Sequence, residues 1–95
     1  MKFEEHCEES IALFENAYVQ VHQWLDEFAG KPGIGMRHRR FRHHEAGIKQ
    51  VEEMWGKETA LAARRHILSD LQQEGWKMGD HFPEDEADYK RMGLF

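Results

Sequence analysis

The chain has 95 residues, 40% of them hydrophobic and 33% charged, which is the composition of one folded domain and excludes a disordered segment. A formal net charge of −5 disfavours a general nucleic-acid binder, and no apolar run approaches the ~18 residues of a membrane span. The first residues, Met-Lys-Phe-Glu-Glu-His, lack the basic-then-apolar order of a secretory signal, and the single cysteine, Cys7, can form no internal disulfide, so we expect a cytoplasmic protein.

The first predicted helix spans residues 3–28. Its apolar face recurs at spacings of three or four, and glutamates crowd its start, where the helix dipole favours them. The run from Gly30 to Gly35 contains three glycines and a proline, which predicts a turn after this helix. The residues of the face are Phe3, Cys7, Ser10, Phe14, Tyr18, Val21, Leu25 and Phe28.

A second helix is predicted over residues 37–55, with His44 near the centre of its apolar face and Gly56 as its C-cap. A third, over 58–73, has Leu61, Ile67, Leu68 and Leu71 on its buried face. A short helix follows over 84–92. The prediction is an all-α fold, a single domain of residues 1–95 built as a small bundle of three helices plus a short C-terminal helix. The aromatic residues either fill its thin core or serve a homodimer interface.

Residues 36–44 contain four arginines and three histidines. At the start of a helix these cations oppose the helix dipole, and each one costs ~0.3–1 kcal/mol of stability. Ion pairs with the chain's own acids offset this in one interpretation. In the other, Arg37, Arg39, Arg42 and His38 bind a small anionic ligand of the phosphorylated, nucleotide-like kind. DNA is disfavoured, because the helix face through His44 must point into the core.

His22 and Asp26 lie one helical turn apart, and His66 and Asp70 repeat that spacing. Imidazole and carboxylate together suit zinc, manganese, iron or nickel. His22, Asp26 and His44 are predicted to form an open metal site that His43 or His38 could complete. His66 points away from the apolar face of its helix, so we expect it at the surface. A second interpretation of His44 is a buried histidine with hydrogen-bond partners on both ring nitrogens.

The strings His22-Gln-Trp-Leu-Asp26 and Arg37-His-Arg-Arg-Phe-Arg-His-His44, followed by Gly47-Ile48, resemble a family of small bacterial and phage proteins classed as a domain of unknown function. The resemblance covers about residues 21–70 and includes His66 and Asp70. The resemblance implies no activity. It implies that the histidines and aspartates of the motif are the first candidates for site residues.

Three hypotheses for function follow. The first is a metal site beside the arginines which, if the protein is an enzyme, makes it a metal-dependent phosphohydrolase. The second is a non-catalytic binder that sequesters a nucleotide-like anion with the Arg/His segment alone. The third is a structural or dimerisation adaptor without a small ligand, in which the arginines form internal ion pairs.

Overall fold

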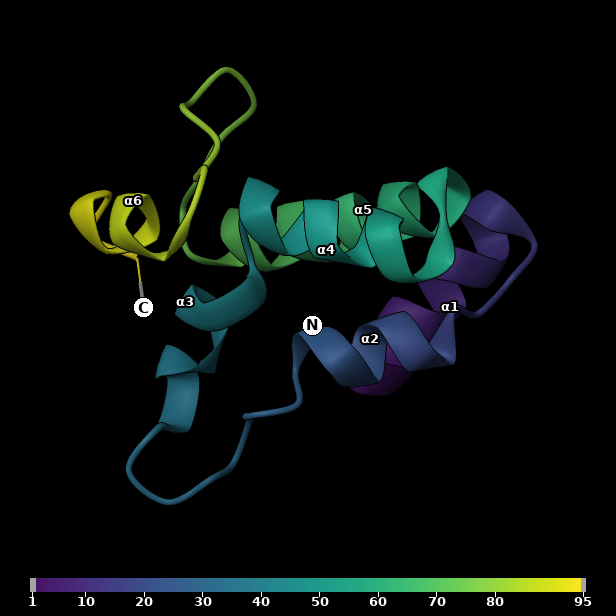
Figure 1. Cartoon of the computed structure of the whole chain (residues 1–95), viewed down its shortest axis with the longest axis horizontal. Coiled ribbons are helices and arrows are strands. Elements are labelled where there is room, and N and C mark those ends of the chain that lie inside the picture. The colour runs from purple at the N-terminus through teal and green to yellow at the C-terminus, as the bar shows by residue number, and fades with distance from the viewer. Residues whose placement is uncertain (1, 95) are drawn as a thin grey trace.

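The computed structural model describes residues 2–94, and within them every side chain except that of Met36. All regular elements in this part of the chain are helical, which confirms the predicted all-α bundle (Figure 1). They are α1 (Phe3–Phe14), α2 (Val19–Leu25), the 3-10 helix η1 (Gly35–His38), α3 (Arg39–Arg42), α4 (Glu45–Trp55), α5 (Lys57–Gln73) and α6 (Glu86–Arg91).

The first predicted helix, over 3–28, is wrong as one element, because it is broken into α1 and α2. Glu15 and Tyr18 have φ angles of 58° and 50°, in the left-handed region that ends a right-handed helix. The Asn16 side chain accepts a hydrogen bond from the backbone N–H of Tyr18, which closes the turn. The turn reverses the chain, so that α2 packs against α1.

The second predicted helix, over 37–55, is also wrong as one element, since it comprises η1, α3 and α4. His44 is extended, with φ −159°, and is the N-cap of α4: its Nδ1 accepts a hydrogen bond from the backbone N–H of Gly47. The C-terminal loop completes this cap, because the carbonyls of Pro83 and Glu84 accept hydrogen bonds from the next two backbone N–H groups.

Helix α5 confirms the predicted helix over 58–73 to within one residue and lies beside α4 (Figure 1). Its buried face differs from the prediction. Leu61 is 57% exposed, whereas Ala63, Ile67 and Leu71 have no exposed surface. Helix α4 covers one side of α5 while α1 and α2 cover another, so α5 is buried over more of its circumference than one apolar stripe provides.

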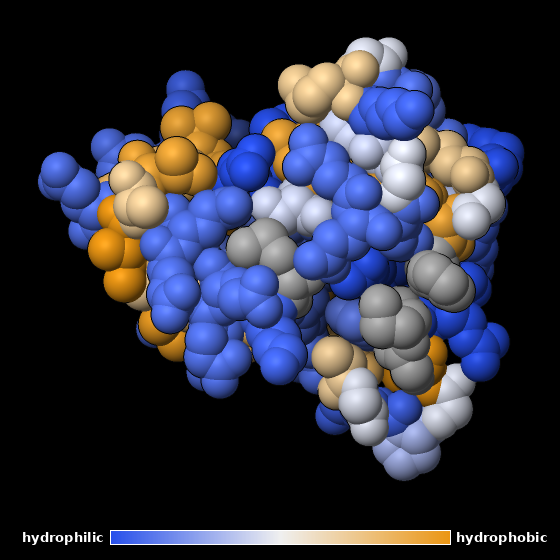
Figure 2. All heavy atoms as spheres, turned by 180° about the vertical axis from the view of Figure 1, so that it is seen from behind, coloured by the Kyte–Doolittle hydropathy of each residue, from blue (hydrophilic) through white to orange (hydrophobic). Residues whose placement is uncertain are grey.

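Few of the large aromatic residues fill the core. Trp76 and Tyr89 are buried, but Phe3, Phe41 and Trp55 remain 37–38% exposed. Apolar side chains gather at the end of the molecule where the α1–α2 and α4–α5 connections lie (Figure 2). The homodimer stays a prediction. None of the helices in the described part of the chain is long and apolar enough to cross a membrane.

Gly47, at the start of α4, packs directly on the backbone of α3. A Cβ at this position would overlap the carbonyl oxygen of Arg42. We expect Gly47→Ala to lower the free energy of unfolding by about 2–3 kcal/mol, because backbone cannot move aside as a side chain can. Urea unfolding measures this, with the exposed change Lys49→Ala as the control, for which less than ~0.5 kcal/mol is expected. Equal stability of the two variants would contradict the close packing.

Candidate metal centre

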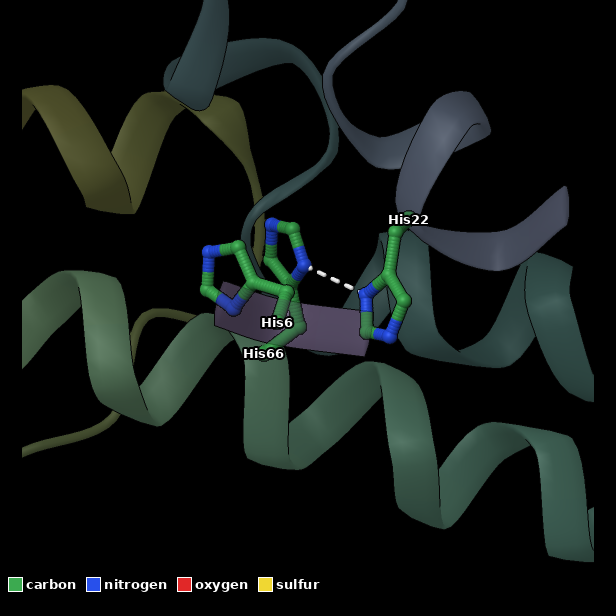
Figure 3. A group of neighbouring side chains, drawn as sticks. All are labelled: His6, His22 and His66. Atoms are coloured by element: carbon green, nitrogen blue, oxygen red, sulfur yellow. Dashed lines mark hydrogen bonds between the residues drawn. The ribbon is translucent and has the colours of Figure 1, made fainter. Parts of the chain in front are cut away.

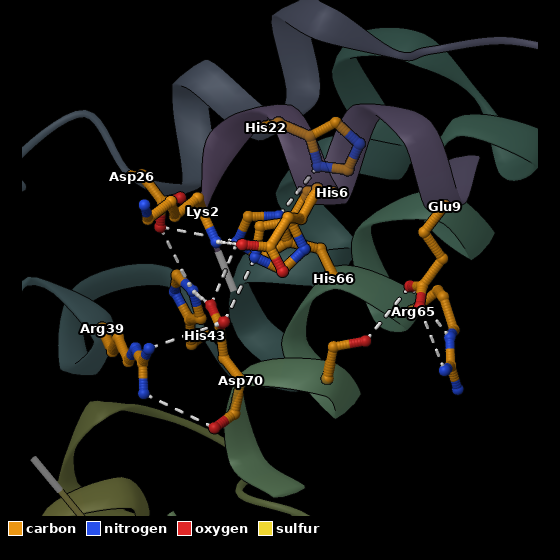
Figure 4. A network of polar contacts seen from close by, with 12 residues as sticks. Lys2, His6, Glu9, His22, Asp26, Arg39, His43, Arg65, His66 and Asp70 are labelled. Carbon is orange, nitrogen blue, oxygen red and sulfur yellow. Dashed lines mark hydrogen bonds and ion pairs between the residues drawn. The ribbon is translucent and has the colours of Figure 1, made fainter. Parts of the chain in front are cut away.

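Histidine and aspartate side chains from both halves of the chain meet on one side of α5 (Figure 4). The turn between α1 and α2 brings these two helices together over this side of α5. The break before α4 places His38 and His43 beside them. The members are His6 of α1, His22 of α2, Asp26 directly after α2, His38 of η1, His43 directly after α3, and His66 and Asp70 of α5.

Four of these residues direct one atom each at a common point. His43 Nε2 lies 3.4 Å from Asp26 Oδ1 and 3.0 Å from Asp70 Oδ2. His66 Nε2 lies 3.4 Å from the same oxygen of Asp26 and 3.3 Å from the same oxygen of Asp70. Two imidazole nitrogens and two carboxylate oxygens therefore alternate around a small buried space.

These four distances fit the ligand spacing of a coordination shell. Ligand atoms ~2.1 Å from one ion in a tetrahedral arrangement lie about 3.4 Å from each other. Two of the four atoms, Asp26 Oδ1 and His66 Nε2, are buried and have no hydrogen-bond partner among the described residues. Buried polar atoms without partners are costly, and a metal ion is one partner that would satisfy both.

A second group, His6, His22 and His66, also brings its ring nitrogens within 4.8 Å of one another. Its geometry is less suited to a metal. The rings of His6 and His66 stack with centroids 3.6 Å apart and an interplanar angle of 18°, so they do not converge on one point. Both nitrogens of His22 also have partners, Ser10 Oγ at 2.7 Å and His66 Nδ1 at 2.8 Å.

The electrostatics of the four-residue group favour a cation. Burial alone would raise the pKa of Asp26, but the imidazoles of His38 and His66 hold it well below the usual range of an aspartate. Burial likewise opposes the lowered pKa of Asp70, which His43, His6 and His66 bring about. Both carboxylates are thus charged at neutral pH, and they need positive charge beside them.

The two histidines of the group respond differently to this charge. Burial lowers the pKa of His43 to about 4, although Asp70 acts in the opposite direction, so its Nε2 carries a free lone pair at neutral pH when the proton is on Nδ1. Burial would also lower the pKa of His66, but Asp26 and Asp70 raise it above its ordinary value. The two carboxylates therefore favour a proton on His66, and a metal ion bound at Nε2 would have to displace a proton from that atom.

A pocket of about 530 Å³ borders the group. Asp26 and Asp70 lie in its wall together with His22, His38 and Arg39. His38 Nε2 is 3.3 Å from Asp26 Oδ1. The pocket gives a small molecule a path to the two carboxylates that the metal would share.

The three arginines predicted to bind an anion are placed apart. Arg39 is buried, and its guanidinium contacts Glu74 Oε2 at 2.9 Å and Asp70 Oδ1 at 3.5 Å. Arg42 donates to the carbonyl of Trp24 and lies over its indole ring. Arg37 is exposed and donates to a backbone carbonyl. Arg39 is the member of this set that lines the pocket.

One predicted exposure, one omission and one predicted ligand among the histidines differ from the structure. His66 was expected at the surface, which is wrong, because it is 1% exposed. His6 was not predicted as a site residue, yet it is buried and its Nε2 lies 3.1 Å from Asp70 Oδ1. Its spacing from Phe3 and Ser10 places it on the buried face of α1, and this was the available signal. The structure places His44 outside the cluster.

His44 uses both ring nitrogens on backbone groups. Its Nε2 donates to the carbonyl of Arg40 and its Nδ1 accepts from Gly47, and burial lowers the pKa of the ring. We expect His44→Ala to cost about 1–2 kcal/mol of stability, as the loss of an N-cap does, without changing zinc binding. His44→Asn, which retains a capping side chain, should recover much of the stability. Thermal unfolding and zinc titration check both parts, and loss of zinc binding in His44→Asn would contradict this assignment.

A family model described as "Domain of unknown function (DUF6915)" matches residues 1–85. The chain belongs to this family. The match includes every residue of the histidine–aspartate cluster and ends just before α6. It confirms the expected class of family, a domain of unknown function. No curated protein and no solved structure matches the chain.

Proposed function

We propose that this member of the family binds one divalent transition-metal ion through Asp26, His43, His66 and Asp70, and uses it to hydrolyse a small phosphorylated molecule. The convergence of the four ligand atoms at 3.0–3.4 Å is the observation that carries the proposal. Two imidazoles with two carboxylates suit zinc, manganese or iron.

The charges around the pocket favour a metal-dependent role over sequestration by arginine alone. Its wall holds three carboxylates, Asp26, Glu27 and Asp70, against one guanidinium, that of Arg39. That guanidinium is already engaged by Asp70 and Glu74. The carboxylates therefore repel an anion unless a bound metal ion offsets their negative charge.

A bound metal supplies two functions for phosphoester hydrolysis: it polarises a phosphoryl oxygen and lowers the pKa of a water ligand. In this chain His38 is a candidate proton carrier, because it lines the pocket and its Nε2 lies 3.3 Å from Asp26 Oδ1. It is placed to donate a proton to a leaving oxygen or to accept one from water.

The test begins with untagged protein, purified without metal-affinity resin and stripped with a chelator. Native mass spectrometry after addition of zinc or manganese should show one ion per chain. Asp26→Asn should abolish binding, since it removes the charge of a ligand whose Oδ1 lies 3.4 Å from both His43 Nε2 and His66 Nε2. His81→Ala is the matched control, because it removes a histidine whose side chain is 59% exposed and paired with Asp88 instead.

The second step measures metal-dependent release of phosphate from p-nitrophenyl phosphate and its diester. Activity in the parent and in His81→Ala, but not in Asp26→Asn, is the expected result. No metal bound by the parent would reject the proposal as a whole. One bound metal with no hydrolysis of either compound would reject the hydrolase and retain the metal centre.

A further inference from the structure

A chain of two short contacts leads away from the candidate metal centre into the protein. His66 Nδ1 lies 2.8 Å from His22 Nδ1 (Figure 3). His22 Nε2 in turn lies 2.7 Å from Ser10 Oγ. All three residues are at most 3% exposed. The contacts are therefore shielded from water. In such a buried environment hydrogen bonds are strong and a missing partner is costly.

The position of one proton in this chain determines the position of the next. A histidine binds a metal ion through a ring nitrogen that carries no proton. If His66 Nε2 is a ligand, the proton of the neutral ring is on Nδ1 and is donated to His22 Nδ1. His22 then carries its own proton on Nε2 and donates it to the hydroxyl oxygen of Ser10.

We propose that His22 and Ser10 are positioning residues that hold His66 in the Nδ1–H tautomer, with the lone pair of Nε2 directed at the metal ion. The inference rests on the metal centre proposed above and gives roles to two residues that are not among its four proposed ligands. Metal-ligating histidines commonly donate their other N–H to a hydrogen-bond acceptor, which fixes the tautomer and the orientation of the ring.

The packing around His66 supports the same role. The His6 ring stacks on the His66 ring at a centroid distance of 3.6 Å, which limits rotation of the His66 imidazole about its Cβ–Cγ bond. His22 contacts the same imidazole at Nδ1. The two nitrogens of His66 consequently face different groups, carboxylates at Nε2 and an imidazole at Nδ1.

The decisive experiment compares zinc affinities of Ser10→Ala, Ser10→Thr and the parent protein. Ser10→Ala removes the terminal acceptor and leaves every proposed ligand in place, so we expect zinc affinity to fall about tenfold. Ser10→Thr, which keeps the hydroxyl, should recover most of it. Ser69→Ala is the control, because Ser69 is another buried serine whose hydroxyl contacts Glu9.

A second measurement is independent of the variants. Long-range ¹H–¹⁵N NMR spectra of the zinc-loaded parent should show the His66 proton on Nδ1 and the His22 proton on Nε2. A parent that binds no zinc overturns this inference together with the metal centre. A parent that binds zinc, with Ser10→Ala binding equally well or with the His22 proton on Nδ1, overturns the positioning role and leaves the metal centre standing. A His66 proton on Nε2 overturns both the positioning role and the assignment of His66 as a ligand.

Discussion

Asp70→Asn is expected to lower zinc affinity by about 100-fold or more, because the amide cannot supply the second anionic ligand. The same change should lower the stability of the metal-free protein by roughly 3 kcal/mol, since several buried partners lose a charged carboxylate at once. Arg39, whose Nη2 lies 3.5 Å from Asp70 Oδ1, is left with Glu74 as its carboxylate partner, and His6 and His43 each lose a contact of 3.0–3.1 Å.

The two effects are separated by Glu74→Gln. Glu74 accepts hydrogen bonds from Arg39 and from Tyr89, so this variant should also unfold more easily. It contributes no proposed ligand, and it should still bind zinc. Urea unfolding of the stripped proteins and zinc titration by calorimetry give both quantities. Parent-like zinc affinity in Asp70→Asn would eliminate Asp70 as a ligand.

Zinc affinity should fall by about tenfold for each pH unit below the pKa of His66, because the metal must displace one proton from that ring. The carboxylates of Asp26 and Asp70 raise the pKa of His66, so the decline should begin at a higher pH than an ordinary histidine would give. His43 should add nothing in this range, since burial lowers its pKa to about 4.

The measurement is a series of zinc titrations between pH 5.5 and 8.5, with circular dichroism at each pH to verify the fold. His81→Ala should show the same pH dependence as the parent, because His81 pairs with Asp88 and is not one of the proposed ligands. An affinity that does not change with pH over this interval would contradict a role for His66 as a ligand.

The arginine segment bears on two of the three functional hypotheses. Its contacts with Glu27, Glu74 and Asp70 are the internal ion pairs that an adaptor would need. Those same contacts support a different role within the metal proposal: Arg39 holds Asp70 from one side while His6 holds it from another. In that proposal Arg39 holds the carboxylate of Asp70 in place, and the metal ion would provide the positive charge for an anion.

Local patterns in the sequence determined the helical class and the course of α5. The apolar spacing over 58–73 and the glycines at 56 and 75 bound that helix correctly, because they act within a few residues. The i,i+4 spacing of His66 and Asp70 likewise placed both on one face of it. His43 and Asp26 were singled out by residue type and motif.

Only the tertiary structure decided which of these residues meet. The helix breaks at Glu15–Tyr18 and at His44 contain neither glycine nor proline. The first is closed by a local contact with the Asn16 side chain, and the second depends in part on the distant carbonyls of Pro83 and Glu84. His66 is buried because α1 and α2 fold over a flank of α5 that one apolar stripe leaves polar. Burial of such a flank depends on distant segments packing against it, and so the cluster is a property of the fold.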